Sequence, residues 1–198
     1  RDLHSFPTRR SSDLNDFKVF DTGRPTKNSG TFGDWETRRH AIFVTPDADA
    51  SQAYGKYDKK FKPGANVMPV YIRAEKPLDM TGGYVPQHVA DQFESAGLNP
   101  RWLHRFGWSH FDDEEGKHFV ETAKKLGYDS VRFIDEHPDT GDSFETWALF
   151  HPRQIKSAIG NRGTFDPKNP DITMAAGGEV DTDTMRAALA LRKKPKRA

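Results

Sequence analysis

The sequence predicts an α+β domain in which a mostly antiparallel sheet carries helices on its flanks. Runs rich in β-branched and aromatic residues predict strands at 42–44, 66–74, 128–135 and 144–150. The last two are separated by turn-forming residues and therefore form a predicted hairpin. Between the second and third strands, residues 86–126 carry helical periodicity. The predicted strands thus stand before and after a helical insert, and this arrangement favours the α+β class.

Composition limits the classes of function. The chain has 198 residues, of which 34% are hydrophobic, enough for one domain with a modest core. Its formal net charge of +1 provides no overall field that would favour nucleic acid. The absence of cysteine excludes disulfides and thiolate metal sites. The histidines of the insert lack the spacing of a zinc site on one helix, so we expect no metal, and no apolar run approaches the length of a membrane span.

The stretch from Ala41 to Tyr54 organises the chain. Ile42–Val44 predicts a buried strand, Thr45 is a candidate N-cap, and Pro46 suits the first position of a helix. Ser51 and Tyr54 are three residues apart and therefore share one face of that helix. A strand end followed by a Ser/Tyr face could hold a flat polar ligand. The alternative is an ordinary strand and an amphipathic helix with aromatic core residues.

The segments around this stretch carry weaker patterns. Asp21 to Trp35 is rich in Gly, Pro, Thr, Asn and Ser and predicts a long loop. Arg38–His40 precede the strand and could meet a pyrophosphate, although a solvated charge cluster is the simpler interpretation. Pro69 within the second strand indicates an edge strand or a bulge. Residues 76–80 predict a short extended piece.

The helical insert divides at glycines. We expect helices over 87–96, ended by Gly97, over 100–106, and from an Asp112 N-cap through Leu126, ended by Gly127. The inward face of the last helix is predicted to hold Phe119, Val120, Ala123 and Leu126.

The Phe43…Ser51-x-x-Tyr54 pattern resembles the second motif of the ADP-ribosyltransferase fold. The resemblance implies a split, mostly antiparallel sheet with NAD as substrate. It also implies that Ser51 hydrogen-bonds the nicotinamide carboxamide and that Tyr54 stacks on the nicotinamide ring. Phe43 would pack on the other side of the ring, and Thr45 belongs to the same cofactor-binding set.

The second half of the chain resembles, over 127–131 and 147–172, the end of the ADP-ribosyltransferase-like domains of phage and mobile-element polyvalent proteins. The resemblance implies that the catalytic glutamate is Glu145. It also implies that the chain is a mono-ADP-ribosyltransferase that modifies a host protein in the bacterial cytoplasm.

Two departures from the family pattern bear on activity. The first motif, a His or Arg on an N-terminal strand, is absent from residues 15–40. The family places its glutamate eight positions before Gln154, which is the position of Thr146, one residue after Glu145. A one-residue slip turns a strand side chain to the other face, and a β-bulge near Thr146 would restore it. Without the bulge, the chain is predicted to be a catalytically degenerate binding or interaction module.

Three segments are predicted from these patterns. Residues 1–14 resemble a translated sequencing adapter, so we expect a non-native segment there and a native chain that begins upstream. Residues 15–174 form the ADP-ribosyltransferase-like domain, and residues 175–198 form a linker with a basic tail. Nucleic-acid binding through that tail is a third interpretation, for which a solvated charge run is the simpler alternative.

Overall fold

The computed structural model of the chain describes residues 2–5, 19–20, 22, 25–30, 33–57, 68–99, 110–158, 168 and 170–172. Its described part contains one seven-stranded sheet with the order β6-β7-β8-β4-β1-β5-β9. The strands are β1 (Asp2–Ser5), β4 (Ile42–Thr45), β5 (Met68–Ile72), β6 (Pro77–Met80), β7 (Ser130–Glu136), β8 (Ser143–Leu149) and β9 (Ile155–Ser157). All neighbours are antiparallel except the parallel pair β6 and β7. This confirms the predicted α+β class with its mostly antiparallel sheet.

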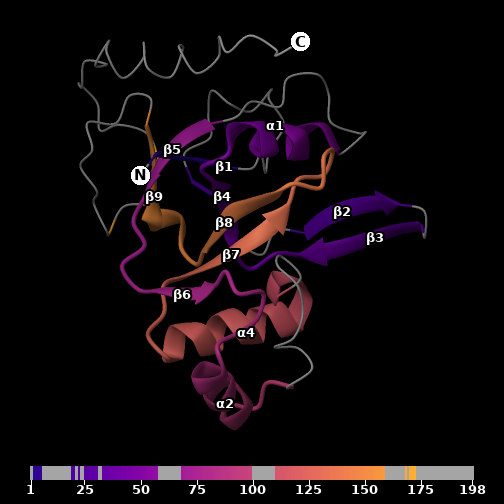
Figure 1. Cartoon of the computed structure of the whole chain (residues 1–198). Helices are drawn as coiled ribbons and strands as arrows, with labels where there is room; N and C mark the ends of the chain where they lie inside the picture. Colours follow the sequence, from indigo (N-terminus) through magenta and orange to yellow (C-terminus); the bar gives the residue numbers. More distant parts are fainter. Residues whose placement is uncertain are drawn as a thin grey trace.

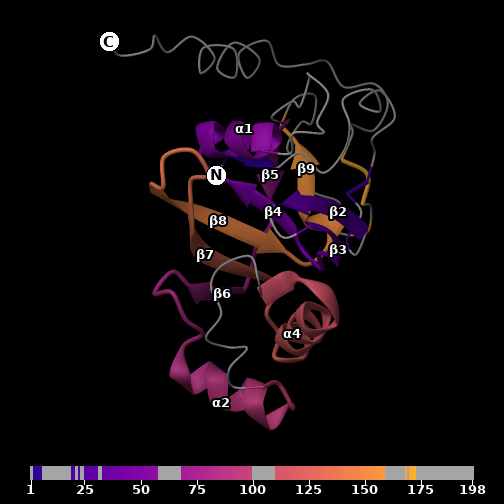
Figure 2. The ribbon, with the colours of Figure 1, turned by 90° about the vertical axis from the view of Figure 1, so that its right-hand side faces the viewer.

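Helices pack against the sheet in two places. Figures 1 and 2 show α1 (Ala48–Tyr57) above the strands, and α4 (Asp113–Lys125) with α2 (Gln87–Ser95) below them. A short 3-10 helix, η3 (Pro152–Gln154), leads into β9. The predicted helix ends at Gly97 and Gly127 are confirmed by their φ angles of 90° and 84°, which favour glycine. No helix in the described ranges is long and apolar enough to cross a bilayer.

The sequence prediction was wrong about the start of α1. Asp47, and not Thr45, caps the helix, because its Oδ1 accepts the backbone N–H groups of Asp49 at 2.9 Å and Ala50 at 3.0 Å. Pro46 therefore lies before the helix. Thr45 Oγ1 accepts the N–H of Asp47 at 3.0 Å and so supports the turn that leads into the cap.

Two further strand predictions needed correction. The loop expected over Asp21–Trp35 contains a hairpin of β2 (Pro25–Gly30) and β3 (Gly33–Arg38), paired without a break from Pro25↔Arg38 to Gly30↔Gly33. A two-stranded ribbon is held by backbone bonds and needs no apolar alternation, which is why the pattern missed it. β5 is not an edge strand despite Pro69, because the short β9 covers it. The ladder of β9 begins at Val70, and Pro69 lies beyond its end.

The first strand occupies a place that the sequence did not indicate. Residues 2–5 form β1 between β4 and β5, with four register pairs to β5 and two to β4. The helix expected at 100–106 and the basic tail lie outside the described residues.

The core lies on both faces of the sheet. On one face, Phe43, Phe133 and Ala148 pack against α2 and α4, where the rings of Phe93 and Phe119 stack with centroids 5.0 Å apart. On the other face, a second cluster contains Phe20, Ile42, Val44, Val70, Leu149, Ile155 and Ile172. Of the inward positions predicted for the last helix, Phe119, Val120 and Ala123 are buried, and Leu126 is partly buried.

Candidate functional site

Helix α1 places Ser51 and Tyr54 on its inner face. Ser51 is fully buried, and Tyr54 is half-buried, whereas the intervening Gln52 is exposed. The shared face predicted from their spacing is therefore present. Ala50 and Ala53 are also buried, and their small side chains let the helix approach the sheet closely.

The side chain of Tyr54 reaches the end of β7. Its hydroxyl donates to Asp135 Oδ2 at 3.0 Å and lies 3.4 Å from the carbonyl oxygen of Glu136. Its ring meets the ring of Phe144 edge-on, with centroids 6.2 Å apart. Contacts from two strands therefore hold this ring in one orientation.

Phe43 lies on the face of the sheet that also carries Phe144. Its ring contacts Phe111 and Phe133 edge-on, with centroid distances of 5.3 and 6.3 Å, and the guanidinium of Arg39 lies 5.8 Å from its centroid. The charge of Arg39 also acts on both Tyr54 and Asp135. Arg39 thus lies over the Phe43 ring and near enough for its charge to act on Tyr54 and Asp135. Arg39, Phe43, Tyr54 and Asp135 are called the Tyr54 cluster below.

Burial shifts the pKa of both hydrogen-bonded groups in this cluster. Removal from water raises the pKa of Asp135, and it is opposed by the Glu136 N–H, the Tyr54 hydroxyl and the charge of Arg39. Burial first, and the neighbouring Asp135 carboxylate second, raise the pKa of Tyr54. The tyrosine therefore keeps its proton and remains a hydrogen-bond donor across the physiological range.

Glu145 lies on the opposite face of the sheet. Side chains alternate along a strand, and β7 and β8 pair Arg132 with Trp147 and Asp135 with Phe144. Glu145 therefore shares a face with Arg132 and Trp147, whereas Phe43 and Phe144 lie on the other. Its backbone joins the two sides, because Thr45 Oγ1 donates a hydrogen bond to the Glu145 carbonyl oxygen at 2.7 Å.

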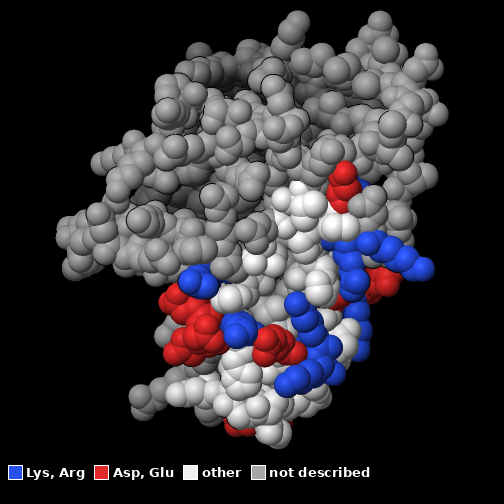
Figure 3. Space-filling view, turned by 180° about the vertical axis from the view of Figure 1, so that it is seen from behind, with Lys and Arg blue, Asp and Glu red and all other residues white. Residues whose placement is uncertain are grey.

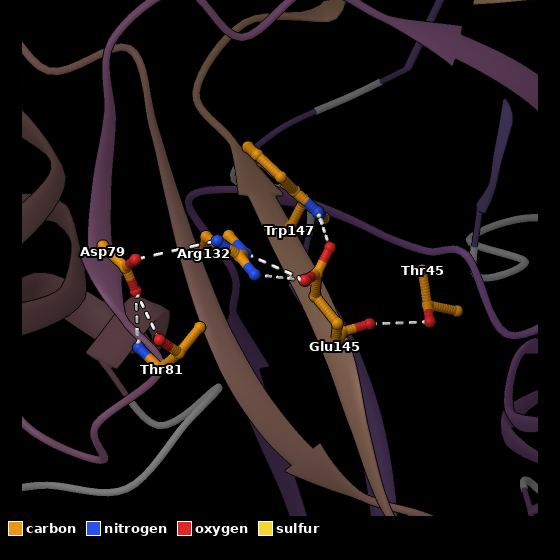
Figure 4. A network of polar contacts seen from close by, with 6 residues as sticks. All are labelled: Thr45, Asp79, Thr81, Arg132, Glu145 and Trp147. Carbon is orange, nitrogen blue, oxygen red and sulfur yellow. Dashed lines mark hydrogen bonds and ion pairs between the residues drawn. The ribbon is translucent and has the colours of Figure 1, made fainter. Parts of the chain in front are cut away.

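Both carboxylate oxygens of Glu145 accept hydrogen bonds on that face (Figure 4). Arg132 donates to Oε2 and the indole N–H of Trp147 donates to Oε1 at 2.8 Å. Arg132 also lies 3.7 Å from Asp79 Oδ2. Thr81 donates to Asp79 from its hydroxyl and its backbone N–H, and these bonds lower the pKa of Asp79. Glu145 thus belongs to a satisfied polar network.

The register leaves Thr146 at the inward position. The β7–β8 ladder runs without a bulge from Ser130↔Leu149 to Glu136↔Ser143. Thr146 pairs with Phe133 and is fully buried, and its Oγ1 has no hydrogen-bond partner among the described residues. The structure therefore brings together Phe43, Tyr54 and the Thr146 position on one face and leaves the Glu145 carboxylate apart from them.

A pocket of about 300 Å³ lies elsewhere, between α4 and the segment before β4. Its charged lining contains Arg38, Glu114, Lys117, Glu121 and Lys124. The two signs of charge are mixed there, and Figure 3 shows acidic and basic side chains interspersed over the lower part of that view. Arg38 and His40, which the sequence offered as possible pyrophosphate contacts, line this pocket, whereas Phe43, Thr45, Ser51, Tyr54 and Glu145 do not.

Asp135 is the residue of this site that sequence reasoning missed. A signal was available, because Val131, Phe133 and Asp135 stand two residues apart on one strand. Val131 and Phe133 are apolar and buried. Because side chains alternate along a strand, Asp135 is expected on the same inward face, where an acidic residue is unusual.

Comparison with known proteins agrees with the architecture. A family model described as ADP-ribosyltransferase in polyvalent proteins matches residues 11–165. No curated protein and no solved structure matches the chain.

Proposed function

Because the chain belongs to the family of ADP-ribosyltransferases in polyvalent proteins, we propose that it binds NAD and transfers ADP-ribose to a protein of a bacterial host. Domains with this activity generally use NAD as substrate. The observation that carries the proposal is the Ser51–Tyr54 face of α1, which is turned toward the sheet, with the Tyr54 ring against Phe144 of β8. The phage or mobile-element origin and the cytoplasm of the host as the place of action are part of the same proposal.

The proposed mode of binding follows from the residues on that face. The resemblance assigns the Tyr54 and Phe43 rings to the nicotinamide ring and the Ser51 hydroxyl to its carboxamide. Ser51 and Phe43 are buried, so the packing around them must open for the ligand to reach both. Thr45 supports the turn between the strand and the helix. Arg39 is a cation at the edge of the cluster, and its guanidinium is suited to pair with the pyrophosphate of NAD.

Transfer requires breaking the bond between nicotinamide and ribose through a transition state with oxocarbenium character. The protein contributes by holding the dinucleotide and by placing negative charge near the developing cation. Glu145 is the carboxylate that the sequence pattern proposes for this role. To act, its side chain must leave Arg132 and Trp147 and reach the other face of the sheet.

A second candidate function is a non-catalytic NAD-binding or interaction module that keeps the fold. It is supported by the position of Glu145 on the face opposite Phe43 and by the threonine at the inward position. Thr146 has no charge with which to stabilise a cation. This candidate predicts NAD binding without turnover.

One experiment separates the two functions. The 198-residue chain is titrated with NAD by calorimetry and incubated with labelled NAD to detect automodification, alongside Glu145→Ala and Thr146→Ala. Transfer that is lost in Glu145→Ala and kept in Thr146→Ala supports the enzyme with Glu145 as its catalytic carboxylate. Transfer lost only in Thr146→Ala contradicts that assignment, and binding without transfer supports the module.

The host target is tested separately. The bacterial extract is first freed of its own NAD. The chain and labelled NAD are then added, and the labelled proteins are identified. Labelling of a discrete protein that requires the Ser51–Tyr54 face, shown with Ser51→Ala, supports the proposed acceptor class. Labelling of nothing but the chain itself contradicts a host acceptor.

A further inference from the structure

The hydroxyl of Tyr54 has a specific partner in Asp135. The two lie on segments 81 residues apart, yet Tyr54 OH and Asp135 Oδ2 are separated by 3.0 Å. The same carboxylate uses Oδ1 to accept the N–H of Glu136 at 2.9 Å. Each oxygen of Asp135 therefore has a donor, and one of these donors comes from the proposed NAD-binding helix.

Asp135 occupies a position that would ordinarily be apolar. Only 6% of the residue is exposed, and the previous inward residue of β7 is the core residue Phe133. Burying a carboxylate is unfavourable unless hydrogen bonds and charges compensate for the lost water. Here the compensation comes from the Glu136 N–H, the Tyr54 hydroxyl and Arg39. A carboxylate kept in such a place is a candidate for a functional role.

Asp135 also lies on the appropriate side of the sheet. It faces the same way as Phe43 and Thr146, because it pairs with Phe144 and alternates with Phe133. The ring of Phe144 stands beside that of Tyr54 and limits its sideways movement. The tyrosine ring is thus fixed at its hydroxyl end by Asp135 and along its side by Phe144.

We propose that Asp135 is a positioning residue for NAD, which holds the ring of Tyr54 in the orientation that receives the nicotinamide. This inference rests on the proposed function. A ring that is already fixed loses little conformational freedom when the ligand stacks on it, so more of the stacking energy contributes to affinity. Without Asp135, the ring must be ordered each time a ligand binds.

The test measures the dissociation constants of NAD and of nicotinamide by calorimetry on the 198-residue chain. The variants are Asp135→Ala, Asp135→Asn, Tyr54→Phe and the double variant Asp135→Ala/Tyr54→Phe. Each single loss of the hydrogen bond is expected to weaken binding about tenfold, the usual effect of a hydrogen bond to a charged group. The double variant should be no weaker than either single variant, because both remove the same bond.

Two comparisons separate positioning from a structural role. Asp135→Asn keeps an acceptor oxygen and should recover most of the affinity that Asp135→Ala loses, and Glu136→Gln, next to it on the chain, should bind as the unmodified chain does. Thermal unfolding shows that each variant is folded. If turnover is present, KM for NAD should rise while kcat changes little.

The outcomes distinguish the two proposals. If the unmodified chain binds NAD and Tyr54→Phe binds it equally well, the positioning role is wrong and the proposed function stands. Additive losses in the double variant also refute the shared bond. If the unmodified chain binds neither NAD nor nicotinamide, the proposed function fails, and the inference fails with it. If Asp135→Ala does not fold, the comparison of NAD affinity between Tyr54→Phe and Asp135→Asn decides. The proposal requires weaker binding in Tyr54→Phe than in Asp135→Asn.

Discussion

Arg132 directs two nitrogens at one oxygen of Glu145, with Nε at 2.8 Å and Nη2 at 2.7 Å from Oε2. The two residues come from adjacent strands and share a face of the sheet. The glutamate side chain is only 18% exposed, so its charge depends on this partner more than a surface charge would. The pair is a reason for a glutamate at this position that is independent of catalysis.

Removing Arg132 should therefore destabilise the fold. We expect Arg132→Ala to lower the free energy of unfolding by about 1–3 kcal/mol, because it leaves a partly buried carboxylate without its charged donor. Urea unfolding measures the change. Lys117→Ala is the matched control, since it breaks an ion pair with Glu114 at 3.5 Å between exposed side chains, where we expect less than about 1 kcal/mol. Equal losses in the two variants would contradict the structural role of Arg132.

Thr146→Val should separate stability from ligand binding. The fully buried hydroxyl has no partner among the described residues, so replacing it with a methyl group should leave stability unchanged or raise it by about 1 kcal/mol. If the hydroxyl faces the ligand, NAD affinity falls at the same time. Thr122→Val in α4 is the control, because its buried hydroxyl also lacks a described partner but lies on the helix and not on β8. It should change stability similarly and leave NAD affinity unchanged.

Asp135 and Asp79 should give opposite dependences of stability on pH. The pKa of Asp135 is raised in the folded protein, so the folded state favours the protonated form, and its charge destabilises the fold as pH rises from about 3.9, the ordinary value, through the folded value. The stability of the unmodified chain relative to Asp135→Asn should therefore fall over that window. Asp79 has a lowered pKa, so its stabilising effect is present above the ordinary value and is lost as pH falls through the folded value.

Urea unfolding of the unmodified chain, Asp135→Asn and Asp79→Asn between pH 3 and pH 7 measures both trends. The difference between the unmodified chain and each variant cancels the contribution of all other titrating groups. Slopes of the same sign for the two variants would show that Asp135 is better solvated than its position on β7 indicates.

Gly116 connects the helix packing to the Tyr54 cluster. A Cβ at this position would lie 2.2 Å from the carbonyl carbon of Phe111, whose ring contacts Phe43. We expect Gly116→Ala to destabilise the chain by about 1–3 kcal/mol, because the neighbour is backbone and must shift. Gly82→Ala is the control, since nothing lies within 4 Å of its Cβ position and the change there should be within about 0.5 kcal/mol. Thermal unfolding compares the two variants.

The sequence predicted the elements whose local pattern and packing agree. The β7–β8 hairpin and α4 were found because their apolar residues repeat with the period of the structure that they form. The β2–β3 ribbon was missed because backbone pairing alone holds it. The cap of α1 was placed two residues early because Thr45 and Asp47 are both good N-caps, and only the geometry shows which side chain reaches the free N–H groups.

The site was predictable only in part. The spacing of Ser51 and Tyr54 fixed their common face, since helix geometry depends on local sequence. The position of the Glu145 carboxylate was harder to predict. The face on which it lies depends on whether β8 contains a bulge, and a bulge is a property of strand pairing. The contact of Asp135 with Tyr54 was equally hard to predict, because it is a tertiary contact between residues 81 positions apart in the sequence.

The four-residue strand β1 lies between β4 and β5 and pairs with both. Main-chain groups make a ladder of this kind, and almost any residue other than proline can supply them. The presence of a peptide in this slot therefore matters more for an unbroken sheet than the identity of its side chains. Without the strand at residues 2–5, the order β6-β7-β8-β4-β1-β5-β9 would divide into a four-stranded part and a two-stranded part with no backbone ladder between them.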